Sequence, residues 1–329
     1  MTAPRPLPAD QIAEAFRQAL VAAEAFLGAT APNPPVGCAA LDADGAILAV
    51  AAHQFAGAEH AEVAALSACR AKGQLDRLDT LVVTLEPCNH HGRTPPCVEA
   101  IVGSGAHTVW IGASDPNPAV AGGGAASLAL AGLTVGIIAD LPHPKATDLS
   151  QQAARLIAPF ATRSRLGRPW LTLKQALTAD GGMIPPPGSK TFTSEASLTQ
   201  AHGLRRRADA IITGSGTILA DAPLFTVRRG GDPRRTPRRL AILDRRRRTP
   251  DAYLESARDR GFQVSLHDDI PGLLADLAAG GALEALVECG PTLLDAFLTA
   301  DVWDERVTFR QSPDPGDPDS VEILTRRAG

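Results

Sequence analysis

Three potential zinc ligands and one carboxylate lie in two short segments of the amino-terminal half, and the fold must bring these segments together. The first segment is His60-Ala61-Glu62; the second starts at Pro87-Cys88 and ends, after eight intervening residues, at Cys97. A catalytic zinc ion takes three protein ligands and leaves its fourth position to water, whose pKa falls to about 7 on the metal. We predict that His60, Cys88 and Cys97 are the three ligands.

Glu62 remains when the ligands are assigned, and we predict that it is the catalytic acid and base. Zinc deaminases of nucleobases use such a carboxylate for proton transfer, in the pattern His-x-Glu followed by Pro-Cys-x-x-Cys. This chain differs in the wider gap between its cysteines. The alternative is a closed structural site in which His90 or His91 is the fourth ligand, but such sites commonly contain a Cys-x-x-Cys pair, which is missing from the sequence.

The order of elements predicts an α/β protein of about two domains, since 329 residues exceed the usual length of one. In the first half we expect helices over residues 11–27, 60–72 and 98–102, and strands over 36–41, 46–52, 80–85, 108–112 and 133–138. This alternation is typical of a three-layer α/β/α sandwich. His60 and Cys97 then lie near helix N-termini, where the helix dipole favours a thiolate.

A proline-bearing segment over residues 140–168 is predicted to be a linker with one short helix. We therefore expect a deaminase domain over residues 1–146 and a second domain over 147–329. The second domain should contain strands over 170–177, 209–213, 240–243, 263–266 and 285–288, and helices over 195–207, 273–279 and 292–298. Residues 312–319 are rich in proline and aspartate and indicate a surface loop.

Composition narrows the environment and the partners. The chain has no run of 18 apolar residues and no signal-peptide pattern, and its five cysteines favour a reducing compartment, so we expect a cytoplasmic protein without membrane contact. Residues 201–250 carry 13 arginines and four aspartates, a net +9, whereas residues 251–329 carry six arginines and 16 acidic residues, a net −10. Aromatic residues make up only 4% of the chain, so we favour a solvated basic face over nucleic-acid binding.

Longer motifs resemble one family, the bifunctional deaminase/reductase of riboflavin biosynthesis. The motifs of the first half are LEPCNHHGRTPPC over residues 85–97, APNPPVGC over 31–38 and DPNPAVAGGG over 115–124. Those of the second half are LTADG over 177–181, LR at 204–205, ADAI over 208–211, TILADAPLFTVR over 217–228 and ECGPTLL over 288–294. The resemblance implies a cytidine-deaminase-like domain followed by a domain similar in fold to dihydrofolate reductase, with zinc and NADPH as cofactors.

The resemblance also implies site residues. It implies NADP contacts at Ala176, Thr217, Asp221, Gly290, Pro291, Thr292, Leu293, Leu294, Asp295 and Ala296. It implies substrate contacts at Asn33, His53, Ser189, Arg205, Phe225, Arg228 and Glu288. Two of these have other interpretations: Asn33 could serve a turn between prolines, and His53 could be an ordinary surface histidine.

Elementary chemistry supports part of this set. Residues 290–292 lead from a strand into a helix, whose N-terminal N–H groups suit a phosphate. Arg205 and Arg228 could hold a ribose phosphate, although Arg205 belongs to an arginine run that could be solvated. The chain departs from the family pattern at Thr191, Ala222 and Arg245, and its reductase half is short at the C-terminus.

The resemblance implies two reactions. Zinc-dependent hydrolysis would remove the exocyclic amine of a diamino-ribosylamino-pyrimidinone 5′-phosphate, and NADPH would then reduce the ribosyl group to ribityl. A different interpretation is a deaminase of another nucleobase or of RNA, joined to a decayed reductase-like scaffold. Homo-oligomerisation is left open by the sequence.

Overall fold

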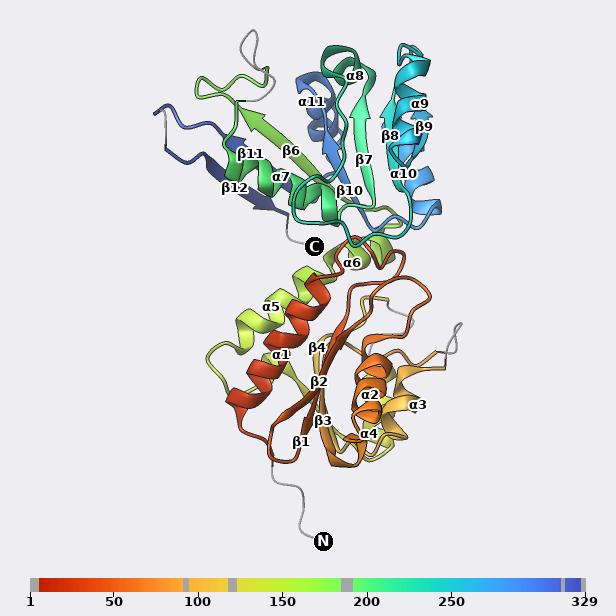
Figure 1. Cartoon of the computed structure of the whole chain (residues 1–329), viewed down its shortest axis with the longest axis vertical. Helices are drawn as coiled ribbons and strands as arrows, with labels where there is room; N and C mark the ends of the chain where they lie inside the picture. Colours follow the sequence, from red (N-terminus) through yellow and green to blue (C-terminus); the bar gives the residue numbers. More distant parts are fainter. Residues whose placement is uncertain (1–5, 91–94, 118–122, 185–191, 315–316, 327–329) are drawn as a thin grey trace. The chain divides into compact units, whose positions relative to one another are not determined.

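The computed structural model describes the chain except residues 1–5, 91–94, 118–122, 185–191, 315–316 and 327–329. The chain forms two compact units, Met1–Arg165 and Leu166–Gly329 (Figure 1). Each unit contains its own β-sheet and its own hydrophobic clusters. The two units are therefore described one after the other.

The first unit is built on a five-stranded sheet in the order β2-β1-β3-β4-β5. Its strands are β1 (Gly37–Asp42), β2 (Ile47–Ala52), β3 (Leu78–Leu85), β4 (Thr108–Ala113) and β5 (Thr134–Ile137). β1 runs antiparallel to β2 and β3, whereas β3, β4 and β5 are parallel. β1 and β2 form a hairpin: Asp42 accepts hydrogen bonds from the N–H groups of Asp44 and Ala46, and Gly45 has a φ of 83°.

Helices cover both faces of this sheet, as predicted for a three-layer sandwich (Figure 1). One apolar cluster joins the sheet to α1 (Ala9–Glu24) and α5 (Ala146–Leu156), and the other joins it to α2 (Ala61–Ala71), α3 (Cys97–Val102) and α4 (Gly123–Leu130). The α1 helix approaches β1 closely, because a Cβ atom at Gly37 would lie 1.9 Å from the carbonyl oxygen of Ala19. Single-turn helices η1 (Leu75–Arg77) and η2 (Ile138–Asp140) complete the unit.

The prediction that residues 140–168 form a linker with one short helix is wrong. This segment forms two helices, α5 and α6 (Ala158–Leu166). Leu149, Ala153 and Leu156 on α5 are buried in the same cluster as the apolar face of α1. This burial makes α5 part of the first unit, although prolines surround it in the sequence.

The second unit contains a seven-stranded sheet in the order β12-β11-β6-β10-β7-β8-β9. Its strands are β6 (Trp170–Leu177), β7 (Ala210–Gly214), β8 (Arg238–Leu243), β9 (Phe262–His267), β10 (Glu284–Glu288), β11 (Glu305–Arg310) and β12 (Ser320–Thr325). All neighbours are parallel except β11 and β12. The carboxyl ends of β6, β7, β8 and β10 therefore meet at one edge, where ligands bind in open α/β sheets.

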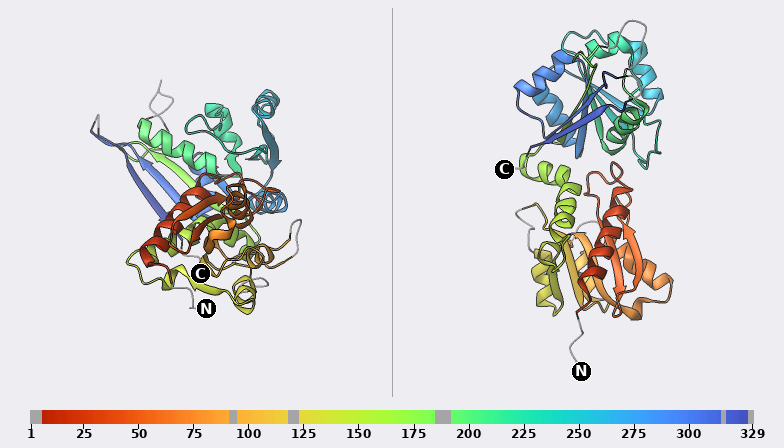
Figure 2. Two further views of the ribbon diagram at one scale, coloured as in Figure 1. Left: turned by 60° about the horizontal axis from the view of Figure 1, so that its bottom comes forward. Right: turned by 90° about the vertical axis from the view of Figure 1, so that its left-hand side faces the viewer.

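Five helices pack on the described part of this sheet. The clusters place α8 (Ser215–Asp221) and α9 (Asp251–Asp259) on one face, and α10 (Ile270–Ala279) and α11 (Pro291–Thr299) on the other. The α7 helix (Glu195–Arg207) packs through Ala201 on Val307 and Phe309 of β11, and Figures 1 and 2 show it along the strands coloured dark blue. The helices α8 and α9 and the strands β11 and β12 lie outside the predicted elements. β12 is exposed along most of its length and so lacks the alternating pattern that predicts a strand.

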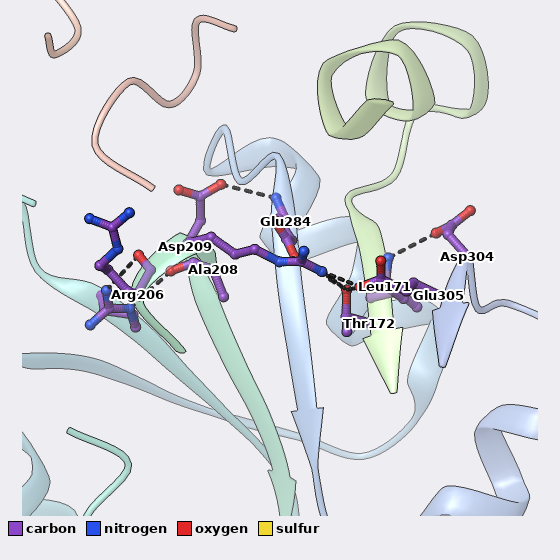
Figure 3. A network of polar contacts seen from close by, with 10 residues as sticks. Leu171, Thr172, Arg206, Ala208, Asp209, Glu284, Asp304 and Glu305 are labelled. Atoms are coloured by element: carbon purple, nitrogen blue, oxygen red, sulfur yellow. Dashed lines mark hydrogen bonds and ion pairs between the residues drawn. The ribbon is translucent and has the colours of Figure 1, made fainter. Parts of the chain in front are cut away.

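A buried ionic network links α7 to the amino-terminal end of β10 (Figure 3). The Arg207 Nε atom donates to Glu284 Oε1 at 2.7 Å, and its Nη2 atom pairs with Glu305. The Thr172 hydroxyl lies 3.2 Å from both carboxylates. Burial is the largest influence on Glu284, and together with nearby Glu305 it raises the pKa of Glu284 to about 7, although Arg207 opposes the shift.

We predict that Glu284→Gln stabilises the chain at alkaline pH. Because the folded pKa exceeds the ordinary value of 4.5, the stability that Glu284 contributes is complete below that value and is lost as pH rises through about 7. Glutamine keeps an acceptor for Arg207 without the second buried charge. Calorimetry at about pH 5.5 and about pH 8.5 should show a larger gain in melting temperature at the higher pH.

The exposed Glu255 on α9 offers the matched control, since Glu255→Gln makes the same chemical change in water. A gain for Glu284→Gln that is equal at both pH values would contradict the argument.

Candidate zinc centre and reductase site

The three predicted zinc ligands lie together in the first unit. His60 Nδ1 is 3.3 Å from Cys97 Sγ and 3.6 Å from Cys88 Sγ, and the three ligand atoms all lie within 4.8 Å of one another. In tetrahedral zinc sites, Zn–N bonds of about 2.0–2.1 Å and Zn–S bonds of about 2.3 Å put ligand atoms roughly 3.5–3.8 Å apart. The distances to His60 and the imidazole–thiolate donor set therefore fit zinc.

Local structure explains how the ligands converge. His60 is the N-cap residue of α2, and Cys97 is the first residue of α3, directly after Pro96. Cys88 follows β3, and its sulfur accepts a hydrogen bond from the Cys97 backbone N–H at 3.4 Å. Two helix N-termini and one strand end thus present their side chains at one point, as the helix positions in the sequence predict.

The thiol of Cys97 stabilises the thiolate form of Cys88. Cys97 donates to Cys88, and together with His60 this lowers the pKa of Cys88 to about 4 against the effect of burial. The proton stays on Cys97, whose pKa is raised by this hydrogen bond and by burial. Such a site already stabilises one thiolate and so favours a soft cation over an ordinary apolar contact.

Glu62 lies in the first turn of α2 and is 3% exposed. Burial is the largest cause of its raised pKa, with the Cys88 thiolate adding to the shift. A carboxyl group that holds its proton more firmly is suited to both accepting and returning a proton near neutral pH. Glu62 is outside the cluster of potential metal ligands.

Asn33 and His53 form a polar pair beside this cluster. His53 Nδ1 lies 3.0 Å from the Glu59 carbonyl oxygen and therefore carries the hydrogen, so Nε2 accepts from Asn33 Nδ2 at 3.1 Å. The rings of His53 and His60 meet edge to face at 5.5 Å. His53 is 2% exposed, so the interpretation as a surface histidine is wrong; Asn33 also serves a turn, through its N–H bond to the Thr30 carbonyl.

Glu86 is a supporting residue that the motif analysis did not single out. Its two carboxylate oxygens accept hydrogen bonds from the backbone N–H groups of Asp115 and Ala125, at 3.1 and 3.0 Å. A Cβ atom at Gly124 would lie 2.0 Å from the Pro87 carbonyl oxygen, so only glycine allows this approach. The glycine-rich motif therefore packs directly against the segment that carries Cys88; the position of Glu86 next to Pro87-Cys88 was its only signal in the sequence.

A fourth protein ligand was the basis of the structural-zinc interpretation. His90 is exposed and is absent from the metal cluster found among the described residues, whereas His91 lies outside those residues. Three cysteines lie outside the cluster: Cys38 and Cys69 are buried, and burial raises the pKa of Cys289 to about 12. These three thiols are poor nucleophiles and poor ligands at neutral pH.

The second unit contains a cavity of about 800 Å³ at the carboxyl edge of its sheet. Its lining comes from the end of β6, the following turn, the start of α11 and the residue after β11: Gln175, Thr178, Ala179, Asp180, Gly181, Gly182, Met183, Ile184, Pro291 and Gln311. This volume lies within the range of about 300–1,000 Å³ for ligand pockets. Ala176 on β6 and the predicted NADP segment from Gly290 border the same edge.

The NADP residues expected at α8 and α11 come together. Gly290 is the N-cap residue of α11, and its N–H donates to Thr217 Oγ1 at 3.0 Å. Four of these residues are exposed: Asp221, Thr292, Asp295 and Ala296. On α11, Leu294 is buried and Leu293 is half-buried. The helix start is thus open on one side, which suits an anionic ligand.

Arg205 and Glu288 form a buried bidentate ion pair. The Arg205 Nε and Nη2 atoms donate to the two oxygens of Glu288 at 2.5 and 2.8 Å. Burial alone would raise the pKa of Glu288, but Arg205 and Lys174 outweigh it and hold the pKa below its usual range. The interpretation of Arg205 as a solvated residue is wrong, and Lys174, 3.9 Å from Glu288, joins the site without having been predicted.

Two further residues that were predicted to contact the substrate lie in the loop after α8. Phe225 is buried with a φ of 56°, and the Arg205 guanidinium lies 5.9 Å from its ring centre. Arg228 is exposed. Ser189 and Thr191 lie outside the described residues.

Four arginines of the basic stretch at 201–250 pair with acidic residues from the end of the same unit. These pairs join Arg205 to Glu288, Arg207 to Glu284 and Glu305, Arg239 to Asp276 and Arg247 to Asp268. Part of the charge asymmetry seen in the sequence is therefore balanced by ion pairs within the unit.

Comparison with known proteins gives a family match for each half of the chain. Residues 9–113 match the cytidine and deoxycytidylate deaminase zinc-binding region, and residues 169–310 match the RibD C-terminal domain. The riboflavin biosynthesis protein RibD of Mycobacterium tuberculosis is 37% identical over 278 residues, which cover 83% of this chain and 77% of that protein. The chain belongs to the RibD family.

Other RibD proteins agree in sequence and structure. The Escherichia coli protein is 34% identical over 313 residues, covering 85% of this chain and 82% of its own length. The structure of Acinetobacter baumannii RibD has a TM-score of 0.79 and 32% identity, and covers 94% of this chain and 89% of that one. A deaminase/reductase from Thermotoga maritima gives a TM-score of 0.78 with 28% identity at the same coverage.

The family confirms the predicted fold class of both domains and the prediction of an enzyme. As a member of the RibD family, the chain is a bifunctional deaminase and reductase of riboflavin biosynthesis, with zinc and NADPH as cofactors. Since both halves match, an unrelated deaminase with a decayed scaffold is not favoured. Among the described residues, no helix has the length and apolar character needed to span a membrane.

We predict that the purified chain carries about one zinc ion, and that Cys88→Ser or Cys97→Ser loses most of it. A serine hydroxyl stays protonated at neutral pH and cannot replace a thiolate ligand. Metal content by mass spectrometry would measure the change, with Cys289→Ser as the control outside the cluster. Stoichiometric zinc in both ligand variants would show that the ligands are wrongly assigned.

Proposed function

We propose that the first unit removes the exocyclic amine of a diaminohydroxyphosphoribosylaminopyrimidine by hydrolysis and releases ammonia. The related Thermotoga maritima protein is described as a deaminase of this compound and a 5-amino-6-(5-phosphoribosylamino)uracil reductase. The observation that carries the proposal is the convergence of His60, Cys88 and Cys97 with the buried carboxyl of Glu62.

The roles of the deaminase residues follow from their contacts. His60, Cys88 and Cys97 would hold zinc, which supplies an activated water molecule when bound. Glu62 would accept a proton from the attacking water and give it to the leaving amine. The Asn33–His53 pair lies beside the cluster and offers hydrogen-bonding groups to the edge of the pyrimidine ring.

We propose that the second unit reduces the ribosyl group of the deaminated product to ribityl. NADPH supplies the hydride when bound, and the protein supplies orientation and charge. Ala176, Thr217, Asp221 and the start of α11 would hold the cofactor along the cavity edge. Arg228 would bind the substrate phosphate, and the buried Arg205–Glu288 pair lies at the carboxyl end of β10.

The two activities are proposed to work separately. The boundary predicted at 146/147 falls at the start of α5, and the packing of α5 on α1 favours placing this helix with the deaminase.

We also propose a reducing compartment such as the cytoplasm, because all five cysteines are free thiols.

Glu62→Gln should lower the rate of ammonia release by at least about 10²-fold, because glutamine keeps the shape but cannot transfer a proton. Zinc content should stay at the level of the unmodified chain, since Glu62 is outside the metal cluster. Glu59→Gln is the matched control, being an exposed carboxylate in the same segment. Near-normal turnover of the Glu62 variant would require a different proton carrier.

Arg228→Ala should weaken the NADPH-dependent step and leave ammonia release intact. A hydrogen bond to a charged group is worth about 1.5–3 kcal/mol, so kcat/KM for the deaminated substrate should fall about 10-fold or more. NADPH oxidation at 340 nm measures this step, and Arg258→Ala on the exposed face of α9 is the charge-matched control. If ammonia release falls equally, the two units do not act separately.

A further inference from the structure

The loop from Ala222 to Arg229 must be held in an unfavourable backbone conformation. Ala222 and Phe225 have φ angles of 41° and 56°, in the left-handed region that side chains other than glycine rarely adopt. Such conformations persist only where the surrounding structure fixes them. The same loop carries Phe225 and Arg228, two residues proposed to contact the substrate.

Side chains from two helices hold this loop. Tyr253 of α9 donates to the Pro223 carbonyl at 2.5 Å. From α7, Arg205 Nη1 donates to the Thr226 carbonyl at 3.5 Å, and Glu195 accepts from Arg229 at 2.5 Å. The chain therefore follows α7 between Thr226 and Arg229.

His202 makes the central contact of this series. It lies on α7, one turn before the Arg205–Glu288 pair, and is 5% exposed. Its Nδ1 atom is 3.1 Å from the backbone nitrogen of Arg228. A backbone N–H can only donate, so Nδ1 must be an unprotonated acceptor and the imidazole must be neutral.

The charges around His202 favour the neutral state. Arg205 faces it from α7, Arg228 and Arg229 from the loop, and Glu288 from β10, where Glu288 is also paired with Lys174 of β6. Burial and then the three guanidinium groups lower the pKa of His202, and Glu288 opposes them. At neutral pH the imidazole therefore keeps Nδ1 available to Arg228.

We propose that His202 is a positioning residue of the reductase site, whose neutral imidazole fixes the main chain of Arg228 and so directs the Arg228 side chain toward an anionic group of the substrate. This inference rests on the proposed function of the second unit. His202 acts through Arg228 and need not touch the substrate. Protonation of Nδ1 would remove the acceptor and place a fourth positive charge among three arginines.

Asparagine and leucine at position 202 form a matched pair for the test. The amide oxygen of asparagine is as many bonds from Cβ as Nδ1, whereas leucine has a methyl group there and cannot accept a hydrogen bond. His202→Leu should raise the KM for the deaminated substrate about 10-fold with a smaller effect on kcat, the change given by losing about 1.4 kcal/mol. His202→Asn should stay near the unmodified value, and ammonia release should be unchanged in both variants.

The pH profile separates positioning from packing. In the unmodified chain, KM should be constant near neutral pH and should rise as the pH falls through the pKa of His202, below its ordinary value of 6.5. His202→Asn should remove this rise, because the amide does not titrate. Equal KM values for the Asn and Leu variants, or an unchanged acid rise in the Asn variant, would overturn the proposal.

Backbone amide hydrogen exchange tests the contact between His202 and Arg228 without an activity assay. In the full chain, a peptide containing Arg228 should exchange faster in His202→Leu than in His202→Asn or the unmodified chain, while the same changes at His267 on β9 should leave it unaltered. Equal exchange in the Leu and Asn variants would overturn the contact itself. If the unmodified chain fails to oxidise NADPH while exchange still depends on His202, the proposed reductase function fails and the contact to Arg228 stands.

Discussion

The glutamates at the two ends of β10 are buried, and the second unit is arranged to pair them. Glu284 and Glu288 lie on the same face of the strand, and α7 supplies Arg207 to the first and Arg205 to the second. A buried carboxylate without such a partner would cost several kcal/mol. The position of α7 over the sheet is therefore fixed by charge as well as by its contact with Phe309.

The two ends of this arrangement have different consequences. At the amino-terminal end, burial and the neighbouring Glu305 raise the pKa of Glu284 to about 7, against the effect of Arg207. At the carboxyl end, Arg205 and Lys174 both face Glu288, which stays ionised beside the cavity edge. The same helix thus pairs a carboxyl group at the amino-terminal end of β10 and one at its carboxyl end, and only the second pair belongs to the proposed reductase site.

The first unit satisfies buried polar groups in another way. The Cys97 thiol and the His60 imidazole stabilise the thiolate form of Cys88. Burial raises the pKa of the neighbouring Glu62, which favours its neutral form. Binding of a soft cation would need little rearrangement, because the three ligand atoms already lie within 4.8 Å of one another. Proton-transfer chemistry and metal binding are then served by one desolvated cluster.

The family and most of the strands could be predicted from sequence, because motif spacing and hydrophobic periodicity are local properties. Motif positions indicated which residues belong to each half, and the alternation of elements predicted two α/β domains. Shorter or two-sidedly exposed elements such as α8 and β12 carry no such periodic signal and were missed.

By itself the sequence determined the zinc ligands to be tested, the carboxylate beside them and the class of each domain, since these depend on residue type and spacing along the chain. Only the tertiary structure decided which residues far apart in the sequence contact one another. It joined Arg205 to Glu288, which lie 83 residues apart in the sequence, and His202 to the main chain of Arg228. It also assigned α5 to the first unit, because burial of an apolar face outweighs the neighbouring prolines. Such pairings depend on burial and on the crossing of a helix over a sheet, which no local pattern of residues encodes.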